Sequence, residues 1–176
     1  PGNAGAGGDA FTYSNVTVNN TSGYATAVQV NGAVNITGLL NLQNGKVLTS
    51  TTNLVTLTPS ASTSSGSTTS ASYIVGPLRV QKNTAGSSIL NFPIGKGADA
   101  RPVILTVNHS GSLLYNYTAE VMNASAYDLN YTLPATIKNV SAVHYWVIDR
   151  TDEFGAAAPA TDLSGNQSIT AYFGEN

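Results

Sequence analysis

The middle of the chain, residues 72–107, holds three apolar runs with alternating side chains, separated by short turns. The turns between them are rich in Gly, Pro, Asn and Lys, and the runs are SYIVGPLRVQK, SSILNFPIGKG and ARPVILTV. Period-two alternation bounded by such turn residues predicts consecutive β-strands. No segment shows a convincing helical periodicity over ten residues, so the sequence predicts an all-β protein.

Shorter strand patterns continue on both sides of this region, and 176 residues suit a single domain. Across residues 24–58 the spacing fits either rungs of a solenoid or hairpins of a sandwich. For the whole chain we expect a two-sheet antiparallel β-sandwich of jelly-roll type with an extended N-terminal segment. Residues 1–18 would form that segment as a tail and a strand. Residues 19–176 would form the sandwich domain, with the Ser/Thr-rich residues 59–71 as an exposed loop.

Three local patterns refine this expectation. Phe11 and Tyr13 share one face of a strand, whereas Val16 and Val18 share the other, which predicts a β-bulge near Asn15. The pairs Asn31-Gly32 and Asn44-Gly45 predict tight turns. Residues 140–149 are apolar on both faces, which is typical of a central strand buried on both sides.

Charged residues make up 9% of the chain, against about 25% in an average protein. Ser, Thr, Asn and Gly take their place, a composition common in secreted and surface-exposed β proteins, so we expect an extracellular location. The net charge of −2 offers no basic surface for nucleic acid. No apolar run reaches the ~18 residues of a membrane helix, and the chain has no cysteine for disulfides.

The order SYIVGPLRV, NFPIGKGADARPVILTV, VSAVHYWVIDRT resembles a β domain of large secreted, surface-displayed, adhesin-like proteins of the Bacteroidota. That group shows a YVxGP strand, then FPxGKG, RP and a YW strand. The matching positions are Tyr73, Val75, Gly76, Pro77, Phe92, Pro93, Gly95, Lys96, Gly97, Arg101, Pro102, Tyr145 and Trp146. The resemblance implies an adhesin-like or structural protein with no known catalytic set. Chains of that group usually continue further, whereas this one stops at Asn176, which suggests a processed piece or a small dedicated subunit.

Several side chains are candidates for chemistry. Ten asparagines begin an Asn-x-Ser/Thr triplet and are candidate glycosylation sites: Asn15, Asn19, Asn20, Asn35, Asn108, Asn116, Asn123, Asn130, Asn139 and Asn166. Asp149, Asp152 and Glu153 lack the spacing of a defined calcium loop, and a solvated turn explains them better. His109 and His144 have no Ser and Asp partners at a recognisable spacing. We therefore expect no metal, no cofactor and no catalytic set.

Two functions fit these observations. The first is a non-enzymatic subunit of a self-assembling extracellular filament, whose N-terminal strand adds to the sheet edge of the next copy. Phe11, Tyr13, Val16 and Val18 would then be the interface residues. The alternative is a glycan- or surface-binding module of a larger secreted adhesin. An enzyme acting on polysaccharide is the least favoured, because no pair of acidic residues stands out among the nine.

Overall fold

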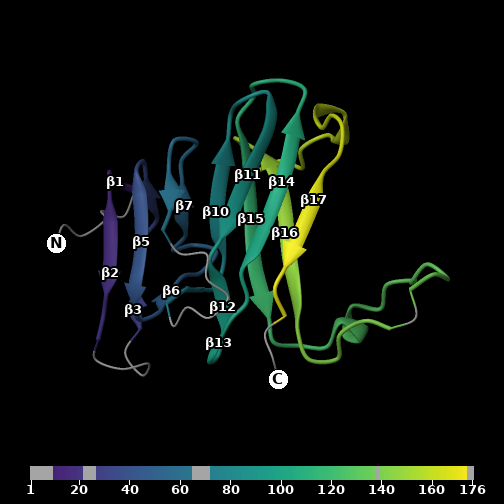
Figure 1. The fold of residues 1–176 in the computed structure, drawn as a ribbon, viewed down its shortest axis with the longest axis horizontal. Helices are drawn as coiled ribbons and strands as arrows, with labels where there is room; N and C mark the ends of the chain where they lie inside the picture. Colours follow the sequence, from purple (N-terminus) through teal and green to yellow (C-terminus); the bar gives the residue numbers. More distant parts are fainter. Residues whose placement is uncertain (1–9, 22–26, 65–71, 138, 174–176) are drawn as a thin grey trace.

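The computed structural model describes residues 10–21, 27–64, 72–137 and 139–173. Strands make up 48% and helices 5%, which confirms the prediction of an all-β protein. The predicted antiparallel jelly-roll sandwich is wrong. The sheets form a β-solenoid of about 3 turns that is rich in parallel pairs (Figure 1).

The N-terminal half consists of short strands, each only a few residues long. They are β1 (Phe11–Tyr13), β2 (Val16–Asn19), β3 (Val28–Gln29), β4 (Val34–Ile36), β5 (Leu39–Asn44), β6 (Val47–Leu48), β7 (Val55–Leu57), β8 (Ser62–Thr63) and β9 (Ile74–Val75).

The C-terminal half has longer strands and two short 3-10 helices. They are β10 (Leu78–Lys82), β11 (Gly86–Phe92), β12 (Ile94–Lys96), β13 (Asp99–Ala100), β14 (Val103–His109), β15 (Tyr115–Met122), η1 (Ala126–Leu129), β16 (Tyr145–Asp152), η2 (Ala160–Asp162) and β17 (Ser168–Ala171).

Three sheets run along the solenoid, and each takes one strand from each of the first three rungs. Their orders are β1-β4-β7-β10-β15-β16, β2-β5-β8 and β13-β12-β9-β6-β3. In the first sheet Phe11 pairs with Val34, Val34 with Val55, and Val55 with Leu78, all in parallel. These steps of 23, 21 and 23 residues are the repeat of the solenoid.

Apolar side chains stack inside the solenoid, one from each rung. One column of register partners is Tyr13, Ile36, Leu57 and Val80, and another is Val28, Val47, Ile74 and Ile94. The later members of both columns belong to the buried core. The alternate positions, such as Asn35 and Thr56, point to the other face of the same sheet. Burying these columns stabilises strands that are too short to be stable alone.

Polar residues and glycines form the corners between strands. Asn15 lies at the corner between β1 and β2, where its Oδ1 accepts a 2.7 Å hydrogen bond from the Leu39 backbone N–H of the next rung. A Cβ on Gly38 would lie 2.5 Å from that same Oδ1, so the rungs stack closely only with glycine there. The parity change near Asn15 is therefore a solenoid corner. Likewise Asn44-Gly45 turns the chain from β5 into β6, which pair with strands of other rungs.

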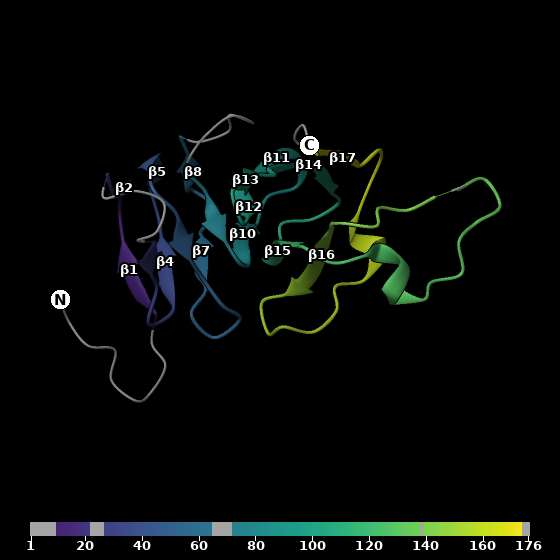
Figure 2. The same ribbon diagram turned by 90° about the horizontal axis from the view of Figure 1, so that it is seen from below.

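The C-terminal part is antiparallel. β15 pairs with β10 and then with β16, which extends the first solenoid sheet. A separate sheet of order β11-β14-β17 lies as a second layer facing these strands (Figure 2). Apolar residues of both layers, including Leu105 and Val121, belong to one core with the solenoid.

Two further expectations need correction. The strand expected at residues 140–149 is β16, which lies at the edge of its sheet, with Val147 37% exposed. The prediction of a central strand buried on both sides, made because both faces of this segment are apolar, is therefore wrong. The expected loop at residues 59–71 contains β8, and its residues 65–71 lie outside the described part of the chain. Within the described residues, no helix is long and apolar enough to cross a membrane.

Candidate functional site

The first rung of the solenoid, made of β1, β2 and β3, is named the open rung here. Each of these strands is the last of its parallel sheet, and no described residue pairs with its outer side. Tyr13 is 48% exposed, whereas Ile36, its partner in the next rung, is 1% exposed. Val28 is 40% exposed, whereas its partner Val47 is 4% exposed. Side chains that belong to the core columns are therefore uncovered at this end.

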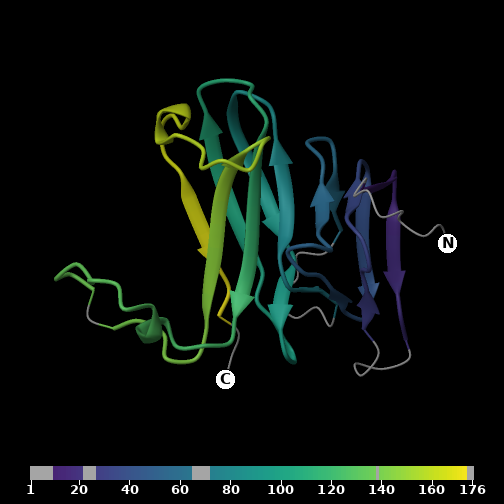
Figure 3. The same cartoon turned by 180° about the vertical axis from the view of Figure 1, so that it is seen from behind.

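The opposite end of the first sheet is β16. Since β1, β4, β7 and β10 are mutually parallel and two antiparallel pairings follow, β16 runs in the same direction as β1. The two edges of this sheet lie at opposite ends of the molecule (Figure 3). On its outer side, residues 150–152 of β16 already bond the chain's own residues 156–158, since the Asp152 N–H donates to the Ala156 carbonyl and the Ala158 N–H to the Arg150 carbonyl. A second copy translated along the sheet would thus bring its β1 beside the remaining edge, residues 145–149, as a parallel neighbour.

A segment between β15 and β16, residues 123–144, extends away from the body at the β16 end (Figures 1 and 3). This projecting arm closes at its base, where the backbone N–H of Ala126 donates a 2.9 Å hydrogen bond to the Ser141 carbonyl. Among its described residues it exposes a set of large apolar side chains: Tyr127, Leu129, Tyr131, Leu133, Ile137 and Val143. Tyr131 is 74% exposed. Exposed apolar side chains gathered in one segment are typical of contact surfaces.

The four residues predicted for strand addition all lie in the open rung. Phe11 and Tyr13 are in β1, which pairs with β4, and Val16 and Val18 are in β2, which pairs with β5. Val18 is 7% exposed and belongs to the chain's own core. The structure thus places these residues at one end of the solenoid, with one side of each strand paired within the same chain.

The residues that carry the family resemblance cluster where the solenoid passes into the antiparallel part. The Tyr73 hydroxyl donates a 2.9 Å hydrogen bond to the Gly97 carbonyl. A Cβ on Gly95 would lie 2.6 Å from Cδ2 of the Tyr73 ring. Lys96 and Glu120 form an ion pair of 3.4 Å between β12 and β15. These contacts hold the chain in place between the solenoid and the antiparallel strands. They give the Tyr, Gly and Lys residues of the YVxGP and FPxGKG patterns a structural role.

Arg101 and Trp146 complete this junction. The Trp146 indole N–H donates a 3.1 Å hydrogen bond to the Arg101 carbonyl, and the Arg101 guanidinium pairs with Asp99 at 3.2 Å. The His144 ring lies edge-on to Trp146, with centroids 5.2 Å apart. His144 is buried beside Arg101, and burial lowers its pKa. His144, which the sequence analysis assigned no role, thus packs against an aromatic ring.

His109 belongs to a separate buried polar cluster between the layers. A 2.6 Å hydrogen bond joins its Nε2 to the Tyr117 hydroxyl, and its Nδ1 has no partner among the described residues. Burial, with smaller effects of Lys82 and Arg150, lowers the pKa of His109 from 6.5 to about 4. The Tyr115 hydroxyl donates to Asp162. His109 is therefore neutral at physiological pH.

The other predicted residues are dispersed. Asn116 is 4% exposed, and its amide donates to the Asp152 carbonyl at 2.7 Å and accepts from Gln81 at 2.9 Å, which disfavours a glycan there. Exposed candidates are Asn15, Asn19, Asn123, Asn130, Asn139 and Asn166, while Asn20, Asn35 and Asn108 are half-buried. Asp152 accepts backbone N–H bonds from Phe154 and Ala156, so it caps a turn after β16. Within the described residues no three His, Asp or Glu are grouped to hold a metal ion.

The fold and its edges define a class: an all-β protein in which a parallel solenoid, open at its first rung, leads into antiparallel strands. Comparison of the chain with protein-family models, with curated proteins and with solved structures gave no match.

Proposed function

We propose that the protein is a non-enzymatic extracellular structural protein, a subunit that assembles end to end into a surface filament. The observation that carries the proposal is the open rung, whose three edge strands leave core side chains uncovered. Solenoids need a cap or a continuation at such an end, and an uncovered edge is a template for pairing. The neighbouring copy is the continuation we infer.

The joint pairs the open rung of one copy with the β16 edge of the next. Both edges of the sheet run in the same direction, so a simple translation continues it with a parallel pair. The projecting arm lies at the β16 end and brings exposed apolar side chains to the uncovered Tyr13 and Val28. Contact between two different surfaces is head-to-tail, and it repeats into a filament. The N-terminal strand thus adds to the next subunit while it stays in its own rung.

The low charge of the chain supports this arrangement, since 9% charged residues leave little electrostatic repulsion between stacked copies. Backbone hydrogen bonds between β1 and residues 145–149 of β16 would supply affinity, and the apolar columns would supply the register. The sequence resemblance to surface-displayed proteins agrees with an extracellular location.

Electron microscopy of the purified protein at neutral pH and physiological salt tests the proposal. The wild-type chain is expected to form regular unbranched filaments. The double variant Tyr13→Lys, Val28→Lys places two charges at the joint and is expected to abolish them. Its melting temperature as a monomer should stay close to that of the wild type, because both side chains are already largely exposed.

The matched control is Leu113→Lys, a 68% exposed apolar residue before β15, outside the proposed joint. This variant is expected to form filaments like the wild type. A wild-type chain that stays a single particle at high concentration would contradict the proposal. So would a Tyr13→Lys, Val28→Lys variant that still assembles.

A further inference from the structure

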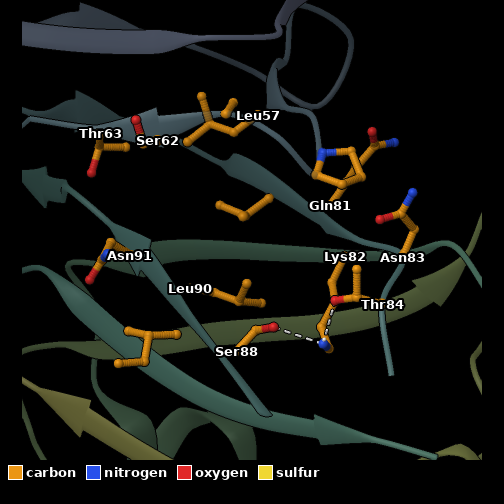
Figure 4. Close-up of a pocket in the computed structure, with 14 residues that line it drawn as sticks. Leu57, Ser62, Thr63, Gln81, Lys82, Asn83, Thr84, Ser88, Leu90 and Asn91 are labelled. Atoms are coloured by element: carbon orange, nitrogen blue, oxygen red, sulfur yellow. Dashed lines mark hydrogen bonds between the residues drawn. The ribbon is translucent and has the colours of Figure 1, made fainter. Parts of the chain in front are cut away.

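A polar pocket of about 270 Å³ lies between the solenoid strands β7 and β8 and the β10–β11 hairpin (Figure 4). Its rim carries amides and hydroxyls, among them Asn83, Ser62 and Asn91, and its apolar wall includes Leu57 and Leu90. A pocket lined by many hydrogen-bonding groups, with some apolar surface, suits a small polyhydroxylated ligand.

Lys82 is the one charged residue that lines this pocket, and it is only 2% exposed. No carboxylate pairs with it among the described residues. Its ammonium donates hydrogen bonds of 2.8 Å to the Ser88 hydroxyl and 3.1 Å to the Thr84 hydroxyl (Figure 4). An ammonium buried with neutral partners is unfavourable, and burial accordingly lowers the Lys82 pKa.

The direction of these two hydrogen bonds matters. A hydroxyl that accepts from an ammonium keeps its own proton to donate elsewhere. Within the described part of the chain, the side-chain hydroxyls of Thr84 and Ser88 make no other hydrogen bond. Both hydroxyls therefore carry a proton available to an incoming acceptor, and the positive charge behind them strengthens that donation.

We propose that this pocket binds a saccharide bearing a carboxylate. The carboxylate accepts hydrogen bonds from the Thr84 and Ser88 hydroxyls and supplies the negative charge that the Lys82 ammonium lacks. The sugar hydroxyls then pair with the amide of Asn83. This pocket does not include residues of the open rung, so a failure of either proposal leaves the other unaffected.

The test is NMR titration of the ¹⁵N-labelled protein at pH 7 with D-glucuronate and D-galacturonate. D-glucose and D-galactose serve as neutral probes, which carry a hydroxymethyl group in place of the carboxylate. The two acids are expected to shift the amide signals of residues 82–84 and 88, with dissociation constants at least about tenfold lower than those of the neutral sugars. Equal shifts with acid and neutral sugars, or no shift with either acid, would overturn the proposal. Equal affinity for acetate would overturn its saccharide part.

Two variants assign the effect to the pocket. Lys82→Met removes the charge at nearly constant volume, and Thr84→Val removes one hydroxyl at an exposed position that does not endanger folding. Each is expected to weaken acid binding about tenfold. Lys96→Met, which removes an ammonium outside the pocket, should bind as the wild type does. If the Thr84→Val variant and the Lys82→Met variant both bound the acidic sugars as tightly as the wild type does, the assigned contacts would be refuted.

Discussion

His109 shows how burial controls the charge of a single side chain. Its ring is 1% exposed and shares its surroundings with the cations of Lys82 and Arg150, which disfavour a second positive charge. Asp162 acts in the opposite direction, yet burial dominates and lowers the pKa of His109 to about 4. The unfolded chain has no such environment, so its histidine titrates near 6.5.

This difference makes stability depend on pH. Between pH 6.5 and about 4 the unfolded chain binds the extra proton, so the His109 contribution is complete above pH 6.5 and is lost as the pH falls toward 4. A shift of this size corresponds to about 3 kcal/mol of unfolding free energy. Urea unfolding at pH 7.5 and pH 4.5 measures the loss. The His109→Gln variant should lose clearly less than the wild type over this interval, and an equal loss in both would contradict the assignment.

Gly76 occupies a position where the backbone geometry requires glycine. It lies between β9 and β10 with φ of +115°, and a Cβ there would lie 2.5 Å from the Thr49 carbonyl oxygen. Gly76→Ala is therefore expected to lower the unfolding free energy by about 2–4 kcal/mol. Gly111→Ala is the control, because nothing lies within 4 Å of its Cβ position. Chemical denaturation of both variants measures their unfolding free energies. If Gly76→Ala lost no more unfolding free energy than Gly111→Ala, backbone geometry would not explain the glycine at position 76.

At the scale of elements, the first sheet should show graded protection against hydrogen exchange. β1 is paired on one side only, whereas β7 and β10 are paired on both sides. In the monomer, amides of β7 and β10 should exchange slowest and those of β1 fastest. Assembly would slow the exchange of β1 and β16 and leave β7 unchanged. Mass spectrometry of exchanged peptides measures this order, and equal exchange of β1 and β7 in the monomer would contradict it.

The elements also show what the sequence could predict. Alternating apolar residues located most strands, because the period-two pattern is local. The antiparallel pairing predicted for the N-terminal half was wrong, because the direction of pairing depends on contacts about 20 residues apart along repeats that share little sequence. Asn44-Gly45 is a good turn signal, but a turn residue does not tell whether the next strand returns beside the last or starts a new side of a solenoid.

For the whole molecule, the open rung and the polar pocket differ in how far sequence could reveal them. The apolar pattern of Phe11, Tyr13, Val16 and Val18 led to their prediction as interface residues, but their position at an uncovered end follows only from the stacking order of the rungs. Lys82 gave no signal, since one lysine at the end of an apolar run is ordinary. Its significance comes from burial among Thr84 and Ser88, which the fold alone creates.

The shared direction of β1 and β16 has a consequence for growth. The proposed filament, joined through these edges, would have structural polarity, with the open rung at one tip and the projecting arm at the other. The two tips differ in chemistry, so they would elongate at different rates. A subunit whose open rung is blocked but whose β16 edge is intact could join one tip and then halt elongation there. Small amounts of such a terminator would shorten the filaments without dissolving them.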